Sequence, residues 1–243
     1  MNIRKNAVVV IVIDKSPEWD VCKPSVLKYC KKYKLHLEVI TQNKYKIDLF
    51  NNPSNNFNLF EKNQIYELFN KYNRILRIDY DTIITPNCPN LFKIVPKDMI
   101  GCVYENVNRK ERIKNIQKHL GDLNWKSGYM NAGVVIASKQ HKEVFNTTIE
   151  EIINIHKIDN ISMLEQDYLN YMIIKLGFDV YKLSYKFNHI KYFSQNRFES
   201  YIIHYAGSKV FDKDLKMKRH KNNKGLWKEL TVEQMKRDYN VLY

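Results

Sequence analysis

The fold is organised around the stretch Arg74-Ile-Leu-Arg-Ile-Asp79-Tyr-Asp81-Thr-Ile-Ile-Thr85. Its apolar run is followed by two carboxylates that are two positions apart, Asp79 and Asp81. Residues 75–78 predict a buried strand. Residues i and i+2 of an extended chain project from one face, so Asp79 and Asp81 can converge while Tyr80 points elsewhere. Ligands of open α/β sheets lie beyond the carboxyl ends of strands. The pair therefore predicts a site for a divalent cation and phosphate oxygens, with a turn-capping pair as the alternative.

The composition indicates one globular unit. The chain has 243 residues, of which 44% are hydrophobic, enough for one sizeable core. No stretch approaches the roughly 18 to 20 apolar residues of a membrane span. The apolar residues 7–13 resemble a first strand more than a signal peptide. The four cysteines form no C-x-x-C pair, which favours reduced thiols and a cytoplasmic location.

The charge is strongly basic, with 40 Lys and Arg against 26 Asp and Glu and a formal net charge of +14. Such an excess favours an anionic partner, and nucleic acid, a membrane surface or a nucleotide would each satisfy it. The basic residues are densest in residues 209–224. A solvated basic tail and a contact surface for an acidic acceptor or phospholipid both stay open.

Hydrophobic periodicity predicts alternating strands and helices along the chain. Strands are expected at residues 7–13, 35–41, 75–78, 98–104, 128–138, 178–183 and 201–207. Helices are expected at residues 24–33, 59–72, 142–156 and 163–176, and a short helix or turn at residues 91–95. The polar residues 43–58 predict a long loop, and the charged residues 105–127 either a mobile flap or a surface helix. This alternation indicates an α/β fold.

Taken together these segments resemble the GT-A glycosyltransferases, most closely the family 8 group that includes glycogenin and bacterial galactosyltransferases of lipooligosaccharide synthesis. The matching parts run in the family's order: the apolar first strand, Lys62, R-I-L-R-I-D-Y-D-T (74–82), G-Y-M-N-A-G-V-V-I (128–136), E-Q-D-Y-L-N (165–170), K-F-N (186–188) and I-I-H-Y-A-G (202–207). The resemblance implies a GT-A catalytic domain over residues 1–211, with a Rossmann-like, mixed and mostly parallel sheet flanked by helices. Residues 212–243 would be a basic C-terminal extension.

The resemblance also implies roles for single residues. Asp79, Asp81 and His204 would bind Mn²⁺ or Mg²⁺, which bridges the diphosphate of a UDP-sugar. The residues implied to bind this donor are Lys62, Asp79, Tyr80, Asp81, Asn131, Ala132, Gly207 and Lys209. Gln166 and Asp167 match the catalytic positions near the anomeric carbon and the sugar hydroxyls. Glu165 stands where the family more often has Asp, and Asn188 is expected to touch sugar or acceptor.

The family moves a hexose, expected here from UDP-glucose or UDP-galactose, with retention by a front-side displacement that needs no enzymic nucleophile. The acceptor is expected to be a glycan, a lipid-linked saccharide or a protein, recognised by residues 105–127 and the basic C-terminus. Peripheral membrane contact and a homodimer are further expectations, and nucleic acid is not expected. Two departures stand out: Lys209 comes one residue early with no Pro-Trp after it, and only Asp14 is available where members contact the base.

Two other classes of protein fit parts of the chain. Haloacid-dehalogenase-type phosphatases carry D-x-D-x-T after an apolar strand, which would make Asp79 a nucleophile, although a strand and helices precede it here and Gly121-Asp122 lacks the second acid of the later motif. The charge of +14 and 17 Tyr would suit a non-enzymic nucleic-acid-binding protein, whose affinity would fall steeply with salt. No recognised nucleic-acid-binding module is present.

Overall fold

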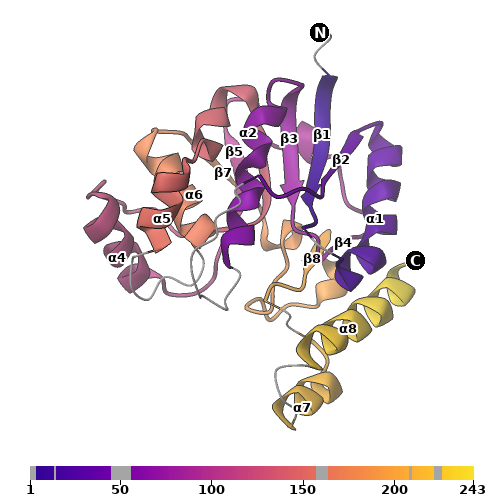
Figure 1. Ribbon diagram of the computed structural model, residues 1–243. Coiled ribbons are helices and arrows are strands. Elements are labelled where there is room, and N and C mark those ends of the chain that lie inside the picture. Colours follow the sequence, from indigo (N-terminus) through magenta and orange to yellow (C-terminus); the bar gives the residue numbers. More distant parts are fainter. Residues whose placement is uncertain (1–3, 14, 45–55, 157–163, 208–209, 222–225) are drawn as a thin grey trace.

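A six-stranded sheet forms the centre of the computed structural model, and helices cover both of its faces (Figure 1). The structure describes residues 4–13, 15–44, 56–156, 164–207, 210–221 and 226–243. The strands follow the order β2-β1-β3-β6-β5-β7. Their bounds are β1 Arg4–Ile11, β2 His36–Ile40, β3 Tyr72–Ile78, β5 Ile100–Tyr104, β6 Met130–Ser138 and β7 Val180–Lys182. Only β6 runs antiparallel to its neighbours, so the predicted mixed, mostly parallel sheet is confirmed.

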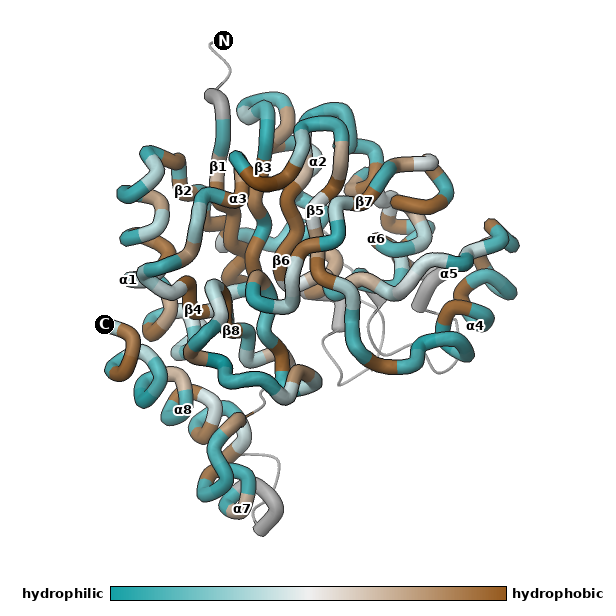
Figure 2. The backbone as a smooth tube through the Cα atoms, turned by 180° about the vertical axis from the view of Figure 1, so that it is seen from behind, coloured by the Kyte–Doolittle hydropathy of each residue, from teal (hydrophilic) through white to brown (hydrophobic). Residues whose placement is uncertain are grey.

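The sheet is buried on both faces, as the β-branched first strand predicts. Alternate residues of β1 enter two different cores. Val9 belongs to the core that includes residues of α5 (Ile149–His156) and α6 (Leu164–Lys175), whereas Val8 and Val10 belong to the core that includes residues of α1 (Pro17–Tyr33). All three valines have no exposed surface. Hydrophobic residues accordingly concentrate along β1, β3 and β6 (Figure 2).

Helix α1 spans Pro17–Tyr33 and begins seven residues before the predicted start. Its first turn is favoured because the Ser16 hydroxyl accepts a hydrogen bond from the Trp19 amide at 3.3 Å, and because Pro17 fills a position that needs no backbone donor. Pro24 lies inside the helix and removes one intrahelical hydrogen bond. Burial of Trp19 and Cys22 in the core beside the sheet stabilises the helical turns that precede Pro24.

Two predicted helices are shorter than expected. Residues 59–72 form a 3₁₀ segment at Asn56–Gln64 and a single α turn, α2, at Ile65–Leu68. Residues 142–156 divide into a 3₁₀ segment at Lys139–Phe145 and α5 at Ile149–His156. The second break has a local cause, because Thr148 and Glu151 exchange side-chain to backbone hydrogen bonds that start a new helix.

The remaining helices lie where the sequence predicts them. They are α3 Leu91–Ile94, α4 Lys110–Leu120 and α6 Leu164–Lys175. Helix α4 lies on the surface, so the surface-helix alternative for residues 105–127 is confirmed. No helix in the described part of the chain is long and apolar enough to cross a membrane.

The chain after residue 211 contains two helices, α7 at Lys213–Lys221 and α8 at Trp227–Leu242. Helix α8 lies beside α1 (Figure 1) and buries Met235 in the core that α1 shares. The Asp238 carboxylate accepts hydrogen bonds from Arg197 and from the Tyr205 hydroxyl. Helix α8 is therefore part of the packed molecule, whereas Lys213, Lys216 and Lys218 of the basic stretch before it are exposed.

The decisive stretch forms two strands instead of one. Strand β3 ends at Ile78, and β4 (Thr82–Ile84) pairs antiparallel with β8 (Ile202–His204) in a separate two-stranded sheet. Asp79 to Asp81 make the link between the two sheets. The pairing sets Thr82 opposite His204, which carries the histidine from the far end of the chain to the aspartates.

Candidate functional site

A cleft of about 320 Å³ opens at the carboxyl end of β3, where α6, β6 and β8 also contribute side chains. Ligand sites of open α/β sheets are found at this edge. Most of the predicted site residues line the cleft: Lys62, Asp79, Tyr80, Asp81, Asn131, Gln166, His204 and Gly207. The structure thus brings together predicted site residues that are up to 145 positions apart in the sequence.

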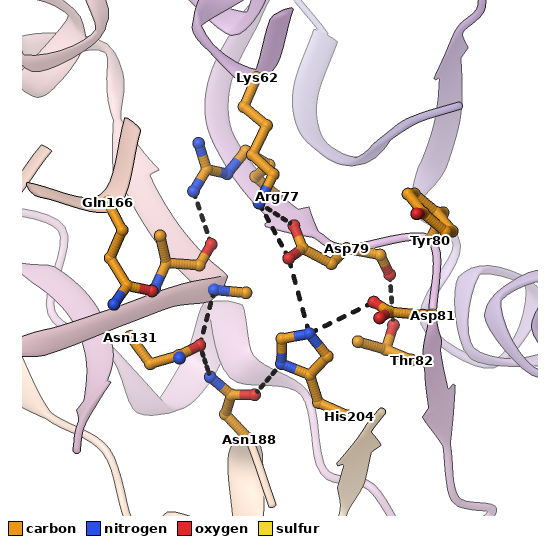
Figure 3. A network of polar contacts seen from close by, with 12 residues as sticks. Lys62, Arg77, Asp79, Tyr80, Asp81, Thr82, Asn131, Gln166, Asn188 and His204 are labelled. Atoms are coloured by element: carbon orange, nitrogen blue, oxygen red, sulfur yellow. Dashed lines mark hydrogen bonds and ion pairs between the residues drawn. The ribbon is translucent and has the colours of Figure 1, made fainter. Parts of the chain in front are cut away.

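Three ligand groups converge in the cleft. Asp79, Asp81 and His204 each offer an atom within 4.8 Å of the other two. The His204 Nε2 atom lies 3.3 Å from Asp81 Oδ1 and 3.6 Å from Asp79 Oδ2 (Figure 3). Two carboxylates and an imidazole suit divalent ions such as Mn²⁺ or Mg²⁺.

A chain of hydrogen bonds sets the orientation of His204. The Gly133 amide donates to Asn131 Oδ1 at 2.9 Å, which identifies that atom as the oxygen. Asn188 Nδ2 also donates to it, at 2.7 Å, so Asn188 Oδ1 faces His204 Nδ1 at 2.8 Å (Figure 3). Nδ1 must then carry a hydrogen, and Nε2 is the atom that faces the carboxylates. This is the tautomer that a metal-binding imidazole requires.

Electrostatics at the triad favour a positive charge between the carboxylates. Burial by itself lowers the pKa of His204, but the neighbouring charges of Asp81 and Asp79 raise this pKa above its usual value. Burial would raise the pKa of Asp81, whereas His204 holds it low. A positive charge is therefore favoured beside Asp79 and Asp81, and a bound divalent ion would supply it in place of a proton on His204.

Lys62 and Glu165 line the cleft and belong to a charge network beside Asp79. Lys62 Nζ lies 2.7 Å from Asp79 Oδ1 and 3.7 Å from Glu165 Oε2. Arg77, whose side chain is fully buried, donates to Glu165 Oε1 at 2.7 Å and to the Ala132 carbonyl at 2.6 Å. Glu165 is thus the counterion of a buried arginine, and removing either partner would leave an uncompensated buried charge.

Glu105 is a site residue that sequence reasoning missed. It follows β5, and its carboxylate, with 1% of the side chain exposed, accepts hydrogen bonds at 3.0 Å from both Asn131 Nδ2 and Gln166 Nε2. Gln166 Oε1 in turn accepts from the Ala132 amide at 2.9 Å. Glu105 therefore orients the two amide side chains of the cleft. Its position just after a strand that ends at this edge was the signal available in the sequence.

An irregularity in the sheet makes the Ala132 backbone available to side chains. The register between β5 and β6 shifts between Cys102 and Val103, which pair with Val135 and Asn131 respectively. The intervening residues of β6 leave the ladder with β5, so the amide of Ala132 bonds Gln166 and its carbonyl bonds Arg77. Such bulges redirect side chains beside functional sites.

Asp167 lies behind the cleft rather than in its lining. Its side chain is 1% exposed, accepts a hydrogen bond from the Tyr129 hydroxyl and lies 3.1 Å from Arg112 Nε. Burial raises the pKa of Asp167 from 3.8 to about 6, although Tyr129 and Arg112 favour the charged form. Asp167 is placed to hold α6 against Tyr129 and so to position Gln166.

Asp167→Asn is expected to change how stability depends on pH. Because the pKa of Asp167 is raised in the folded chain, the unfolded chain loses this proton first, and the wild type loses stability as pH rises from about 4 to about 6. Asparagine does not titrate. The free energy of unfolding of the variant, relative to wild type, should therefore increase by up to about 3 kcal/mol between pH 4 and pH 7, at about 1.4 kcal/mol per pKa unit. Urea unfolding measures this, and a constant difference would contradict it.

Other predicted residues are placed as follows. Tyr80 points away from His204 (Figure 3) and is 36% exposed. Asn188 is fully buried and does not line the cleft, so its contact is with His204 rather than with a ligand. Ala132 offers its backbone, which Gln166 and Arg77 already bond. Asp14 and Lys209 lie outside the described residues.

Comparisons with known proteins give one family and one fold. The model of the family described as "Glycosyl transferase family 8" matches residues 8–210. No similar sequence was found among curated proteins. Among solved structures, a glycosyltransferase involved in glycosylating the major capsid of PBCV-1 is 13% identical with a TM-score of 0.61, over 96% of this chain and all of that one.

Two further solved structures share this fold. The galactosyltransferase LgtC, in complex with donor and acceptor sugar analogs, is 15% identical with a TM-score of 0.56, over 95% of this chain and 96% of that one. Mouse xyloside xylosyltransferase 1 is 12% identical with a TM-score of 0.51, over 86% of this chain and all of that one. At these identities the structures support the GT-A fold.

Proposed function

Since the chain belongs to glycosyltransferase family 8, we propose that it transfers a hexose from a nucleotide sugar to an acceptor hydroxyl, with a divalent cation bound by Asp79, Asp81 and His204. The observation that carries this proposal is the convergence of those three ligands in the cleft at the carboxyl end of β3. The family match confirms the predicted glycosyltransferase. It decides against the phosphatase alternative, in which Asp79 was a nucleophile, and against a non-enzymic protein.

The charges of the cleft suit a metal and a diphosphate together. Glu165 is balanced by Arg77 and Asp79 by Lys62, whereas Asp81 has His204 as its ion-pair partner within the described residues. A bound Mn²⁺ or Mg²⁺ would act as a Lewis acid on the diphosphate leaving group. Lys62, which lines the cleft beside Asp79, is placed to pair with the same phosphates once the metal shares Asp79.

Two amide side chains are proposed to contact the donor sugar. Glu105 holds the amides of Asn131 and Gln166 through two hydrogen bonds to one oxygen. Both amides line the cleft. The nitrogen of each donates to Glu105, and the oxygen of each accepts from a backbone amide, that of Gly133 for Asn131 and that of Ala132 for Gln166. Amide groups fixed in this way can orient hydroxyls at low entropic cost.

We propose retention by a front-side displacement. The acceptor oxygen forms a bond to the anomeric carbon while the bond from that carbon to the phosphate oxygen breaks with its electron pair, and the hydroxyl proton passes to the leaving phosphate. Among the described lining residues the carboxylates are Asp79, Asp81 and Glu165, two of them metal ligands and the third paired with Arg77. This supports a mechanism without an enzymic nucleophile, and an inverted product anomer would reject it.

The donor is proposed to be UDP-glucose or UDP-galactose, and the acceptor a glycan, a lipid-linked saccharide or a protein. Helix α7 is proposed to contact an acidic membrane surface. It carries exposed Lys216 and Lys218 around Met217, which is 53% exposed. Basic and apolar side chains together are typical of peripheral membrane contact.

Thermal stability in the presence of nucleotides tests the donor site. UDP, GDP, CMP and ADP are compared, each with and without Mn²⁺. A ligand at 100 times its Kd stabilises the native state by about 2.7 kcal/mol, and we expect this shift for UDP only when Mn²⁺ is present. If another nucleotide gives the shift, the UDP assignment is wrong. No shift with any nucleotide would reject the proposed transfer reaction.

A further inference from the structure

A second and larger cavity, of about 710 Å³, adjoins the donor cleft across Glu105. It runs between α4 and residues 125–129, and we call it the α4 groove. Glu105 lines this groove, and its carboxylate bonds Gln166 and Asn131 of the cleft. Tyr129, which bonds Asp167 beneath Gln166, also lines it. One layer of side chains therefore separates a molecule in the α4 groove from the reacting centre.

The α4 groove is positively charged. Four cations line it, namely Arg109, Lys110, Lys114 and Lys126. The acidic lining residue is Glu105, which Arg109 already neutralises through two contacts of 2.6 and 2.7 Å. The three lysines are exposed, and the structure gives none of them an ion-pair partner among the described residues. A net excess of three positive charges in one hollow attracts an anion.

The arrangement of the lysines gives no benefit to the fold itself. Lys110 and Lys114 are four residues apart on α4, so they lie on one face and repel each other. Lys126, from residues 125–129, lines the same groove. An anionic group in the groove would relieve this repulsion.

The floor and lining of the α4 groove suit a saccharide. Trp125 and Tyr129 are stacked with ring centroids 6.2 Å apart, and the Trp125 indole nitrogen is a buried donor without a partner among the described residues. Asn108, Gln117 and Ser127 add polar groups. This mixture of aromatic and hydrogen-bonding groups is typical of pockets that orient a polar ligand.

We propose that the α4 groove binds the acceptor, and that the acceptor is a saccharide bearing a negatively charged group. Lys110, Lys114 and Lys126 hold that group, and the reacting hydroxyl reaches the donor sugar beside Gln166. This inference rests on the proposed function, since it names the second substrate of the same reaction.

Binding of matched saccharides without any donor tests the groove separately from transfer. The probes are two pairs, lactose with 3′-sialyllactose and maltose with maltose 1-phosphate, measured by calorimetry. The groove variant is Lys110→Gln/Lys114→Gln/Lys126→Gln. The control is Lys23→Gln/Lys31→Gln/Lys93→Gln, which removes the same charge from exposed lysines of α1 and α3.

The wild type should bind at least one charged saccharide ten or more times more tightly than its neutral partner. The groove variant should lose this preference and the control should keep it. Both variants should keep the stabilisation by UDP and Mn²⁺, because the donor cleft is intact. If the wild type binds charged saccharides through these lysines but no nucleotide, the transfer reaction fails and the groove stands as an anionic-saccharide site.

Three results would overturn the proposal. The first is no preference in either pair, and the second is a preference that the groove variant retains. In the third, phosphatidylglycerol vesicles bind the wild type and the control but not the groove variant, while the saccharides do not bind. The groove would then be a membrane contact.

Discussion

Asp81→Ala should abolish the stabilisation by UDP and Mn²⁺ and lower the transfer rate by about a thousandfold or more. Asp81 lies 3.3 Å from His204 Nε2 and lines the cleft together with Lys62. Without it the site keeps one carboxylate, and that one is shared with Lys62. A metal on a transferring phosphate supplies several kcal/mol, and about 4 kcal/mol corresponds to a thousandfold in rate.

The matched control is Asp179→Ala, which removes an exposed aspartate outside the cleft. It should leave the thermal shift with UDP and Mn²⁺ and the transfer rate unchanged. The measurements are thermal unfolding with UDP and Mn²⁺ and product formation from UDP-sugars. If Asp81→Ala kept a metal-dependent shift with UDP, the three-ligand assignment would be wrong.

Gly133→Ala should remove His204 from the metal site without touching a ligand residue. A Cβ atom at position 133 would lie 2.1 Å from His204 Cε1 and 2.4 Å from its Nδ1. The ring cannot yield easily, because its side chain is 3% exposed and Asn188 holds it at 2.8 Å. We expect Mn²⁺ affinity to fall by about a hundredfold and the free energy of unfolding to fall by about 1 to 3 kcal/mol, the usual cost of overpacking.

Two comparisons separate the clash from a general loss of stability. Gly177→Ala places alanine at φ +69° with no atom within 4 Å of the new Cβ, so it should cost about 1 kcal/mol from backbone strain and leave Mn²⁺ binding intact. The double variant Gly133→Ala/His204→Ala should recover stability relative to Gly133→Ala alone, because the clashing ring is gone. Full Mn²⁺ affinity in Gly133→Ala would contradict the packing argument.

Elements with strong local signals could be predicted from the sequence. The apolar residues 7–13 and 128–138 correspond to β1 and β6 within a few residues. The order of motifs gave the family, and i, i+2 spacing placed Asp79 and Asp81 together. Helix boundaries were predicted less accurately where a capping residue decides them. The Ser16 cap starts α1 before the predicted residue, and the Thr148 cap starts α5 inside a helix that was predicted to be continuous.

The candidate site was predicted as a set of residues with roles, but the sequence did not show which of them line the cleft and which lie behind it. Gln166 and Asp167 are neighbours on α6, yet Gln166 lines the cleft and Asp167 bonds Tyr129 behind it. Glu105 carries no motif of its own and becomes important because two amides from other elements meet its carboxylate.

By itself, the sequence determined the order of strands and helices, the family and the three candidate residues for a metal site, because periodicity, spacing and motifs can be identified along the chain without the fold. Only the tertiary structure decided the contacts that orient the site. The bulge in β6 frees the Ala132 backbone, the β4 and β8 pairing brings His204 to Asp81, and Asn188 fixes its tautomer. These contacts join residues 16 or more positions apart, so their geometry depends on strand register and close packing, which local sequence does not encode.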